Sequence, residues 1–247
     1  MTSAASAREA PKKTLPGTQS QSDKPNGPEA TRAALIAAAL DLFGARGFEA
    51  TSTREIAGRA GANIASIAYH FGGKEGLRQA CAEAVRTQLG AIAAAAFADT
   101  KAEIEAAPDP EMAASLLEAI MGRFIRTALV SPQTQRFVPF VLREISGPSP
   151  VLELLYREVM EPTHKRLCML WGAATGQPGE SENVRLSVFA LVGQAIYFRI
   201  GSEIVTRRMQ WKNYTAVEAD RIAQTVCANL RASIANQNAT LTRKEKP

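Results

Sequence analysis

Residues 52–71 read STREIAGRAGANIASIAYHF, and this stretch decides the fold of the first part of the chain. Ser52 is followed three residues later by Glu55, a capping-box pattern that predicts the start of a short helix. Gly61 accepts a positive φ without steric cost, so it can end that helix. Asn63 can then cap a second short helix. Two short helices joined through a glycine are typical of a helix-turn-helix.

The residue types in this stretch suit contact with DNA, in which the second helix enters the major groove. The start of the first helix offers amides, hydroxyls and a guanidinium to phosphate through Ser52, Thr53 and Arg54. Ile67 and Phe71 are expected to face inward. The outward groups are then Ile64, Ala65, Ser66, Ala68 and Tyr69, and a polar cluster of His70 and Lys74 follows them. The alternative is that Tyr69 and His70 only brace the helix and that Ile64 and Ala65 are merely exposed.

Helices are also predicted on both sides of this stretch. Leu35, Ala39, Leu42 and Phe43 form an apolar stripe that predicts a helix ending at Gly47. A long alanine-rich helix is expected from Lys74 to about Phe97. Further helix starts are indicated by three capping residues that precede proline, Asp109-Pro110, Ser131-Pro132 and Ser149-Pro150, and by a second capping box, Thr215 with Glu218. We therefore expect an all-α fold of about nine helices, with an amino-terminal three-helix unit followed by a bundle.

Composition agrees with a folded helical protein. The chain has 247 residues, of which 46% are hydrophobic and 6% aromatic, so a disordered or fibrous chain is excluded. The longest run without a charged residue, 60–73, contains polar side chains, and the amino terminus lacks an apolar core. We therefore expect no transmembrane helix, no secretory signal and a cytoplasmic location. The net charge of +5 permits a polyanionic partner without proving one.

Four segments are expected along the chain. Residues 1–28 are rich in proline and polar residues and are expected to form a disordered arm, which could touch DNA phosphates. Residues 29–77 should form the helix-turn-helix unit, with its two short helices at about 52–71. Residues 78–238 should form a second helical domain. Residues 239–247 end in TRKEKP and are expected to form a flexible tail.

The sequence resembles the TetR family of bacterial transcriptional regulators, and more narrowly its CecR (YbiH-type) branch. The TetR resemblance covers about 50 residues, and the CecR resemblance rests on looser motifs spread over most of the remaining chain. The matching segments are ARGFEATS (45–52), TREIAGRAG (53–61) and GANIASIAYHFGGKEGL (61–77), followed by PFVLREISGPSP (139–150) and EPTHKRL (161–167).

The TetR resemblance implies a DNA-binding role for ten residues. By position, Ser52, Thr53, Arg54, Tyr69, His70 and Lys74 would mainly hold phosphates, while Asn63, Ile64, Ala65 and Ser66 would lie at or near base edges. The chain departs from the wider family at Ala68, where many members have an aromatic residue, and at Ala62-Asn63, where many have Val-Ser. We therefore expect no base contact at Ala68 beyond a methyl group against thymine.

The resemblance also implies that the last two helices pair with those of a second subunit. The sequence supports this independently, because residues 186–204 are apolar on nearly every side and a second stripe follows in 222–234. The alternative is that both helices form the core of one subunit. The residues expected at a dimer interface are Leu186, Phe189, Gly193, Ile196, Ile222, Val226 and Leu230.

A ligand site is expected in the carboxy-terminal domain, where Pro162 inside a helix would kink the axis. The residues expected to line a pocket for a small organic effector are Phe140, Arg143, His164, Trp171 and Tyr197. His164 and Cys168 share a helical face, but two ligands make an incomplete metal site, so no metal and no cofactor are expected. Three cysteines are too few for a disulfide framework, and we expect them to be small buried apolar residues.

These patterns predict a homodimeric DNA-binding transcriptional regulator rather than an enzyme. We expect a repressor that binds a near-palindromic double-stranded operator and is released by an effector. Two alternatives remain open. One is a metal protein or small-molecule enzyme that uses His164 and Cys168, although the sequence shows neither a nucleophile with its base nor a glycine-rich phosphate loop. The other is an architectural DNA-binding protein without an effector.

Overall fold

The computed structural model describes residues 27–147 and 149–244, so the arm expected over 1–28 lies almost wholly outside the described residues. The described chain is all helical, without strands, which confirms the expected fold class. The α-helices are α1 (Pro28–Arg46), α2 (Thr53–Ala60), α3 (Ala65–Phe71), α4 (Lys74–Ala96), α5 (Lys101–Glu105), α6 (Pro110–Val130), α7 (Pro132–Ile145), α8 (Pro150–Leu155), α9 (Glu161–Thr175), α10 (Glu182–Ile200), α11 (Ser202–Met209) and α12 (Ala216–Lys244).

The described chain has more helices than the roughly nine expected, because two long runs are divided and the short helix α5 follows α4. A π-helical turn, η1 (Tyr156–Met160), separates α8 from α9 without a loop. Pro162 follows in the first turn of α9, within a helical run that continues without interruption from Pro150 to Thr175. Further on, α10 ends at Gly201 and the chain bends by 74° into α11.

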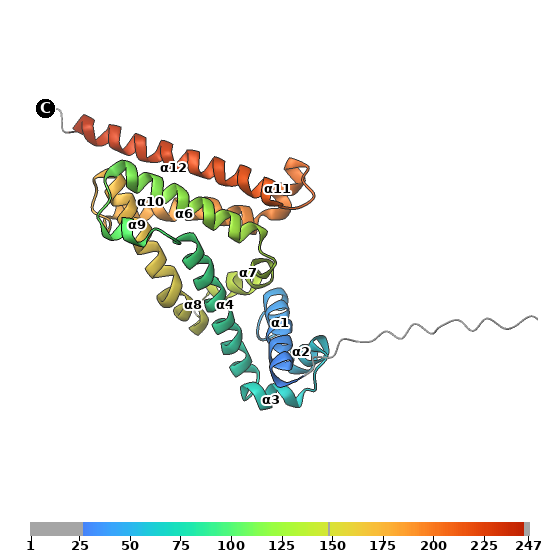
Figure 1. Ribbon diagram of the computed structural model, residues 1–247. Helices are drawn as coiled ribbons and strands as arrows, with labels where there is room; N and C mark the ends of the chain where they lie inside the picture. The colour runs from blue at the N-terminus through green and yellow to red at the C-terminus, as the bar shows by residue number, and fades with distance from the viewer. Residues whose placement is uncertain (1–26, 148, 245–247) are drawn as a thin grey trace, which may run out of the picture.

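The molecule is elongated, and its two ends have different roles in the fold. Helices α1, α2 and α3 gather at one end, and α12 lies across the opposite end (Figure 1). Helix α4 spans much of the distance between them. One hydrophobic cluster packs α1 to α4 against α7 and α8, and a second packs α6, α9, α10 and α12. The DNA-binding candidates and the helical bundle therefore have separate cores.

Helix α7 packs against both α1 and α4. Arg143 donates from Nε to the carbonyl oxygen of Gly44 at 2.7 Å and from Nη2 to that of Ala45 at 2.8 Å, so α7 caps the carboxyl end of α1. A Cβ added to Gly44 would lie 3.0 Å from the backbone nitrogen of Phe140, which shows how closely the two helices approach. The next residue, Glu144, accepts two hydrogen bonds from Arg78 of α4.

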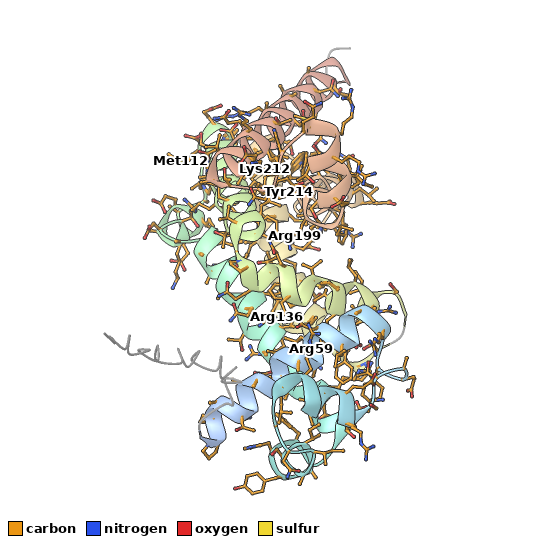
Figure 2. The ribbon with its side chains drawn as sticks, turned by 90° about the vertical axis from the view of Figure 1, so that its right-hand side faces the viewer. Arg59, Met112, Arg136, Arg199, Lys212 and Tyr214 are labelled. Carbon is orange, nitrogen blue, oxygen red and sulfur yellow. The ribbon has the colours of Figure 1, made fainter. Side chains whose placement is uncertain are left out.

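Asp41 adds a surface link between the same elements. Its Oδ2 lies 3.0 Å from Nη2 of Arg59 on α2, and its Oδ1 lies 3.2 Å from Nε of Arg136 on α7. Arg59 and Arg136 are labelled in Figure 2, in the lower half of the view. The exposed ion pairs contribute little stability each, but they connect α1, α2 and α7 at one carboxylate.

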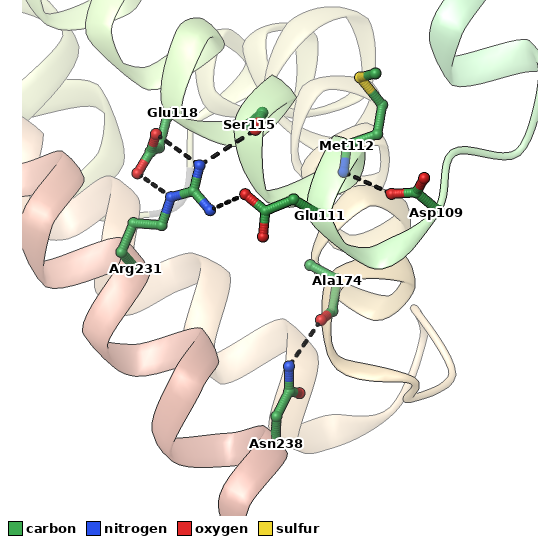
Figure 3. A network of polar contacts seen from close by, with 8 residues as sticks. All are labelled: Asp109, Glu111, Met112, Ser115, Glu118, Ala174, Arg231 and Asn238. Carbon is green, nitrogen blue, oxygen red and sulfur yellow. Dashed lines mark hydrogen bonds and ion pairs between the residues drawn. The ribbon is translucent and has the colours of Figure 1, made fainter.

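Helix α12 packs along α6 through an arginine network (Figure 3). Arg231 contacts Glu118 with two nitrogens, Glu111 at 2.6 Å and Ser115 at 3.2 Å. These carboxylates raise the pKa of Arg231 above its usual value. Beneath them, Ile222, Val226 and Leu230 are buried in the core. Helix α12 is therefore held to its own chain over most of its length.

Helix α12 continues to Lys244, into the segment 239–247 expected to form a flexible tail. Asn238, just before that segment, donates to the carbonyl oxygen of Ala174 at 3.2 Å, which attaches α12 to α9. Residues 245–247 lie outside the described residues. No local pattern indicates this attachment, because its partner is 64 positions away in the chain.

Helix α10 has one buried face and one exposed face. Val184, Val188, Leu191 and Ala195 are buried against the bundle.

In the part of the chain that the structure describes, no single helix has the length and hydropathy to cross a membrane. The bent pair α10 and α11 passes that test only together.

Candidate DNA-binding interface

The start of α2 is built as the sequence predicts. Ser52 accepts a hydrogen bond from the Glu55 backbone nitrogen at 3.2 Å, and Glu55 accepts one from the Ser52 backbone nitrogen at 2.9 Å. The backbone bond from Ser52, followed by its hydroxyl, lowers the pKa of Glu55. Gly61 then takes the left-handed conformation with φ 64°, as a glycine turn requires. The capping box and the turn are confirmed.

Helix α3 begins with a side-chain cap from Asn63. The Asn63 Oδ1 accepts from the backbone nitrogen of Ala65 at 2.9 Å, which leaves its amide group as a donor. Ile67 is buried between the helices, and Phe71 is half-buried against the same cluster. Residues 67 and 71 therefore hold α3 in place, as expected.

The opposite side of α3 is open. Tyr69 is 83% exposed and Ile64 is 48% exposed. Asn63, Ala65 and Ala68 are also exposed, whereas Ser66 and His70 are half-buried. The ring of Tyr69 meets that of His70 edge-on, with centroids 4.9 Å apart. Of the four candidate base-reading residues, the structure thus exposes Asn63, Ile64 and Ala65 but not Ser66.

Charged side chains around this face divide into paired and available groups. Arg46 contacts Glu55 at 2.6 Å, so this guanidinium is engaged. Arg54 is exposed at the start of α2 beside Ser52 and Thr53, and it makes no ion pair with the described residues. Lys74 places its Nζ 4.2 Å from the centre of the Phe48 ring. Arg54 is therefore free to meet an outside group, whereas Lys74 already has a contact within the chain.

Gly76 is a residue of this region whose importance the spacing did not reveal. It lies in the first turn of α4, and a Cβ added there would sit 1.8 Å from the carbonyl oxygen of Phe71, the last residue of α3. Only glycine permits this close approach of α4 to α3.

We expect Gly76→Ala to lower the free energy of unfolding by about 1–3 kcal/mol, because the methyl group must push α3 and α4 apart. DNA affinity should fall with it. Gly90→Ala is the matched control in the same helix, since a Cβ there meets nothing within 4 Å, and it should add about 0.5–1 kcal/mol. Chemical denaturation and fluorescence anisotropy measure both. Equal effects of the two substitutions would contradict the close approach.

Two family models match the chain in succession. Residues 35–81 match "Bacterial regulatory proteins, tetR family", and residues 113–236 match "HTH-type transcriptional dual regulator CecR, C-terminal domain". The HTH-type transcriptional dual regulator CecR of Shigella flexneri is 35% identical over 204 residues, which cover 82% of this chain and 90% of that protein. This chain belongs to the TetR family. Within the family it carries a CecR-type carboxy-terminal domain.

Other comparisons agree over a shorter segment or at the level of the fold. The regulatory protein RaaS of Mycobacterium tuberculosis is 43% identical over 60 residues, 24% of this chain and 28% of that protein. The TetR-family regulator PfmR of Thermus thermophilus superposes with a TM-score of 0.55 at 20% identity, covering 81% of this chain and 94% of that one. A TetR-like regulator from Rhodococcus gives 0.54 at 17%, covering 82% and 96%.

The five residues expected to line an effector pocket lie in different places. Phe140 is buried in the cluster shared by α1 to α4, whereas Trp171 is buried in the bundle, where its Nε1 donates to Gln237. Arg143 is engaged with α1, and Tyr197 is 52% exposed. A hollow of about 490 Å³ lies elsewhere, between α1, α4 and α7. The sequence could identify bulky residues but not that they lie in separate parts of the fold.

The candidate metal or catalytic pair is close but electrically neutral. The Cys168 sulfur lies 3.4 Å from Nδ1 of His164. Burial raises the pKa of Cys168 to about 11 and lowers that of His164, so a thiol faces a neutral imidazole at pH 7. A nucleophilic cysteine requires the thiolate. The described residues contain no group of three metal-ligating side chains.

The residues expected at a dimer interface separate into two sets. Those on α10, Leu186, Phe189, Gly193 and Ile196, are exposed. Those on α12, Ile222, Val226 and Leu230, are buried within the protomer, in line with the alternative interpretation. The apolar stripe expected over 222–234 is present on α12, but α6 of the same chain covers it.

Proposed function

We propose that this TetR-family regulator is a homodimeric repressor that binds a near-palindromic operator and leaves it when a small effector binds. The observation that carries the proposal is the open face of α2 and α3, where Arg54, Ile64 and Tyr69 are exposed at one end of the molecule. Residues 29–77 would form the DNA-binding domain and 78–238 the effector and dimerisation domain. The CecR relative is described as a dual regulator, so activation at some operators is the second candidate.

The proposed contacts follow the geometry of the face. Ser52, Thr53 and Arg54 would hold phosphate at the amino end of α2, where the helix dipole also favours an anion. Ile64 and Ala65 would present apolar groups to thymine methyls. Tyr69 and His70 would mainly hold phosphates. The second set of phosphate contacts would come from Lys74.

The exposed stripe of α10 supports dimerisation through this helix. Leu186 and Phe189 are each 60% exposed, and Ile196, Tyr197 and Ile200 continue the stripe toward the bend. A contiguous apolar face of this kind marks an interaction surface. A hollow of about 260 Å³ between α10 and α12, lined in part by Tyr197, Thr225 and Asn229, would receive side chains of the second copy.

Effector release is proposed through α7. This helix contacts the carboxyl end of α1 through Arg143 and contacts α4 through Glu144. A ligand that favours one position of α7 would therefore favour one position of both recognition helices in the dimer. Release then requires only that DNA and ligand prefer different positions.

The experiment that tests the proposal is selection of DNA by the full-length protein from a random double-stranded library. We expect enrichment of an inverted repeat whose half-sites are centred one helical turn, or a multiple of it, apart. Enriched sequences without two-fold symmetry would contradict a dimeric operator, and lack of enrichment would contradict specific binding. Transcription from the selected site with and without the protein then separates repression from activation.

We expect the protein to elute as a dimer of twice its 26.5 kDa chain mass, and Phe189→Arg to convert it to a monomer. A buried charge without a partner is unfavourable at an interface. Light scattering on a sizing column measures the mass. Met112→Arg on α6 is the control, since Met112 is also exposed but lies away from the α10 stripe. A monomeric wild-type protein, or a dimeric Phe189→Arg, would contradict this interface.

A further inference from the structure

The core face of α10 ends in a charged residue. Val184, Val188, Leu191 and Ala195 lie on that face at intervals of three and four residues, and Arg199 follows one turn after Ala195. The side chain therefore leaves the helix on its apolar side, close to the bend at Gly201. Arg199 is half-buried rather than solvated.

The guanidinium of Arg199 has no acceptor within the described chain. Its Nε is shut off from solvent and makes no hydrogen bond. The hydroxyl of Tyr214, in the loop before α12, is likewise buried and unpartnered. Arg199 and Tyr214 are labelled together where α10 meets this loop (Figure 2). Buried polar groups are nearly always hydrogen-bonded, so two neighbouring exceptions indicate a missing partner.

The electrostatic surroundings indicate the charge of this partner. Burial lowers the pKa of Arg199 below its usual value, and Tyr214 is the one other group that affects it. Burial also raises the pKa of Tyr214, so this phenol stays neutral and keeps its proton to donate. The site thus offers two donors and a positive charge, and no carboxylate of the described chain answers them. An anionic acceptor is the complementary group.

Two aromatic rings lie beside Tyr214 and the bend. Trp211 meets Tyr214 edge-on, with ring centroids 6.2 Å apart. Tyr197 lies against the bend, since a Cβ on Gly201 would be 3.2 Å from its ring. Flat apolar surfaces beside a guanidinium favour a planar ligand that also carries the charge.

We propose that Arg199 and Tyr214 form a binding site for an aromatic carboxylate at the α10–α11 bend. The carboxylate would accept from Nε of Arg199 and from the hydroxyl of Tyr214, with the aromatic body against Trp211. This proposal rests on the effector-released regulator above, for which it names the ligand class. The site adjoins the end of the exposed α10 stripe, so occupancy would change the segment that the second copy contacts.

Isothermal titration calorimetry of the full-length protein with 1-naphthoate tests the site, with neutral 1-naphthamide and inorganic phosphate as comparisons. We expect saturable binding of naphthoate only. Arg199→Gln should weaken it by roughly tenfold or more, as expected for loss of a charge-assisted hydrogen bond. Arg208→Gln, an exposed arginine on α11, should leave it unchanged. Equal binding of naphthamide, equal binding of phosphate, absence of naphthoate binding or full affinity in Arg199→Gln would overturn the proposal.

A second variant separates a ligand site from a structural arginine. Arg199→Met removes the unpartnered charge and keeps an unbranched apolar side chain. The ligand-free protein should therefore melt at a higher temperature, while naphthoate binding is lost. A lower melting temperature would assign Arg199 to packing and overturn the site.

DNA binding, measured on the same sample, distinguishes the two proposals. If naphthoate binds through Arg199 but leaves DNA affinity unchanged, the site stands and effector release by this ligand class fails. If the protein selects no DNA, the proposed function fails, and calorimetry still decides the site.

Discussion

Replacement of Tyr69 by alanine should lower the affinity for operator DNA by about 100-fold. A hydrogen bond to a charged acceptor contributes about 1.5 kcal/mol or more, and a dimer makes the contact twice, so the loss is about 3 kcal/mol. The fold should be unaffected, because Tyr69 is 83% exposed and its ring meets only that of His70. Fluorescence anisotropy on the selected operator measures the affinity.

Two variants sharpen the Tyr69 prediction. Tyr69→Phe keeps the ring and removes the hydroxyl, so it should show most of the loss if the hydroxyl holds a phosphate. Tyr156→Ala removes another exposed tyrosine, on η1, and should bind DNA as the unmodified protein does. Undiminished specific binding in both Tyr69→Ala and Lys74→Ala would refute the contacts assigned to this face.

The second large effect concerns Arg78→Ala, which should lower the free energy of unfolding by about 3 kcal/mol. Arg78 binds Glu144 through two nitrogens, at 2.8 and 3.2 Å, and Glu144 is only 7% exposed. The substitution leaves a carboxylate buried without its cation, which is the costly way to break such a pair. Urea denaturation followed by circular dichroism measures the change.

A double substitution and a surface pair control for this interpretation. Arg78→Met combined with Glu144→Leu should recover most of the loss, because neither charge then remains buried. Arg86→Ala breaks an exposed pair with Glu83 in the same helix and should cost less than about 1 kcal/mol. If Arg78→Ala and Arg86→Ala cost the same, the pair between α4 and α7 has no special role in stability.

Local features are predictable from the sequence because neighbouring residues decide them. The capping box at Ser52, the left-handed Gly61 and the helix starts at Pro110, Pro132 and Pro150 are all expected and all found. The inward position of Ile67 follows from helical periodicity in the same way. A fixed set of such features at fixed spacing also suffices to indicate the family.

Features that depend on contacts between distant segments are not predictable in this way. Periodicity identifies an apolar stripe on α12 but cannot say that α6 of the same chain covers it. Composition presents residues 186–204 as apolar all round, whereas one face is buried and the other exposed. Arg199 looks like an ordinary charged residue, because only the fold shows that it follows the buried face. Gly76 belongs to a family motif, but a side chain is excluded there because the carbonyl oxygen of a residue on another helix lies too close.

The attachment of α7 has a mechanical consequence. Helix α7 holds α1 through Arg143 and α4 through Glu144, and α1 and α7 approach closely at Gly44. A displacement of α7 would therefore be transmitted to α1 and α4 together. In the proposed dimer, the tilt of α7 would then set the distance between the two copies of α3. Because α3 lies at one end of the molecule (Figure 1), a small tilt of α7 would move α3 by a larger distance.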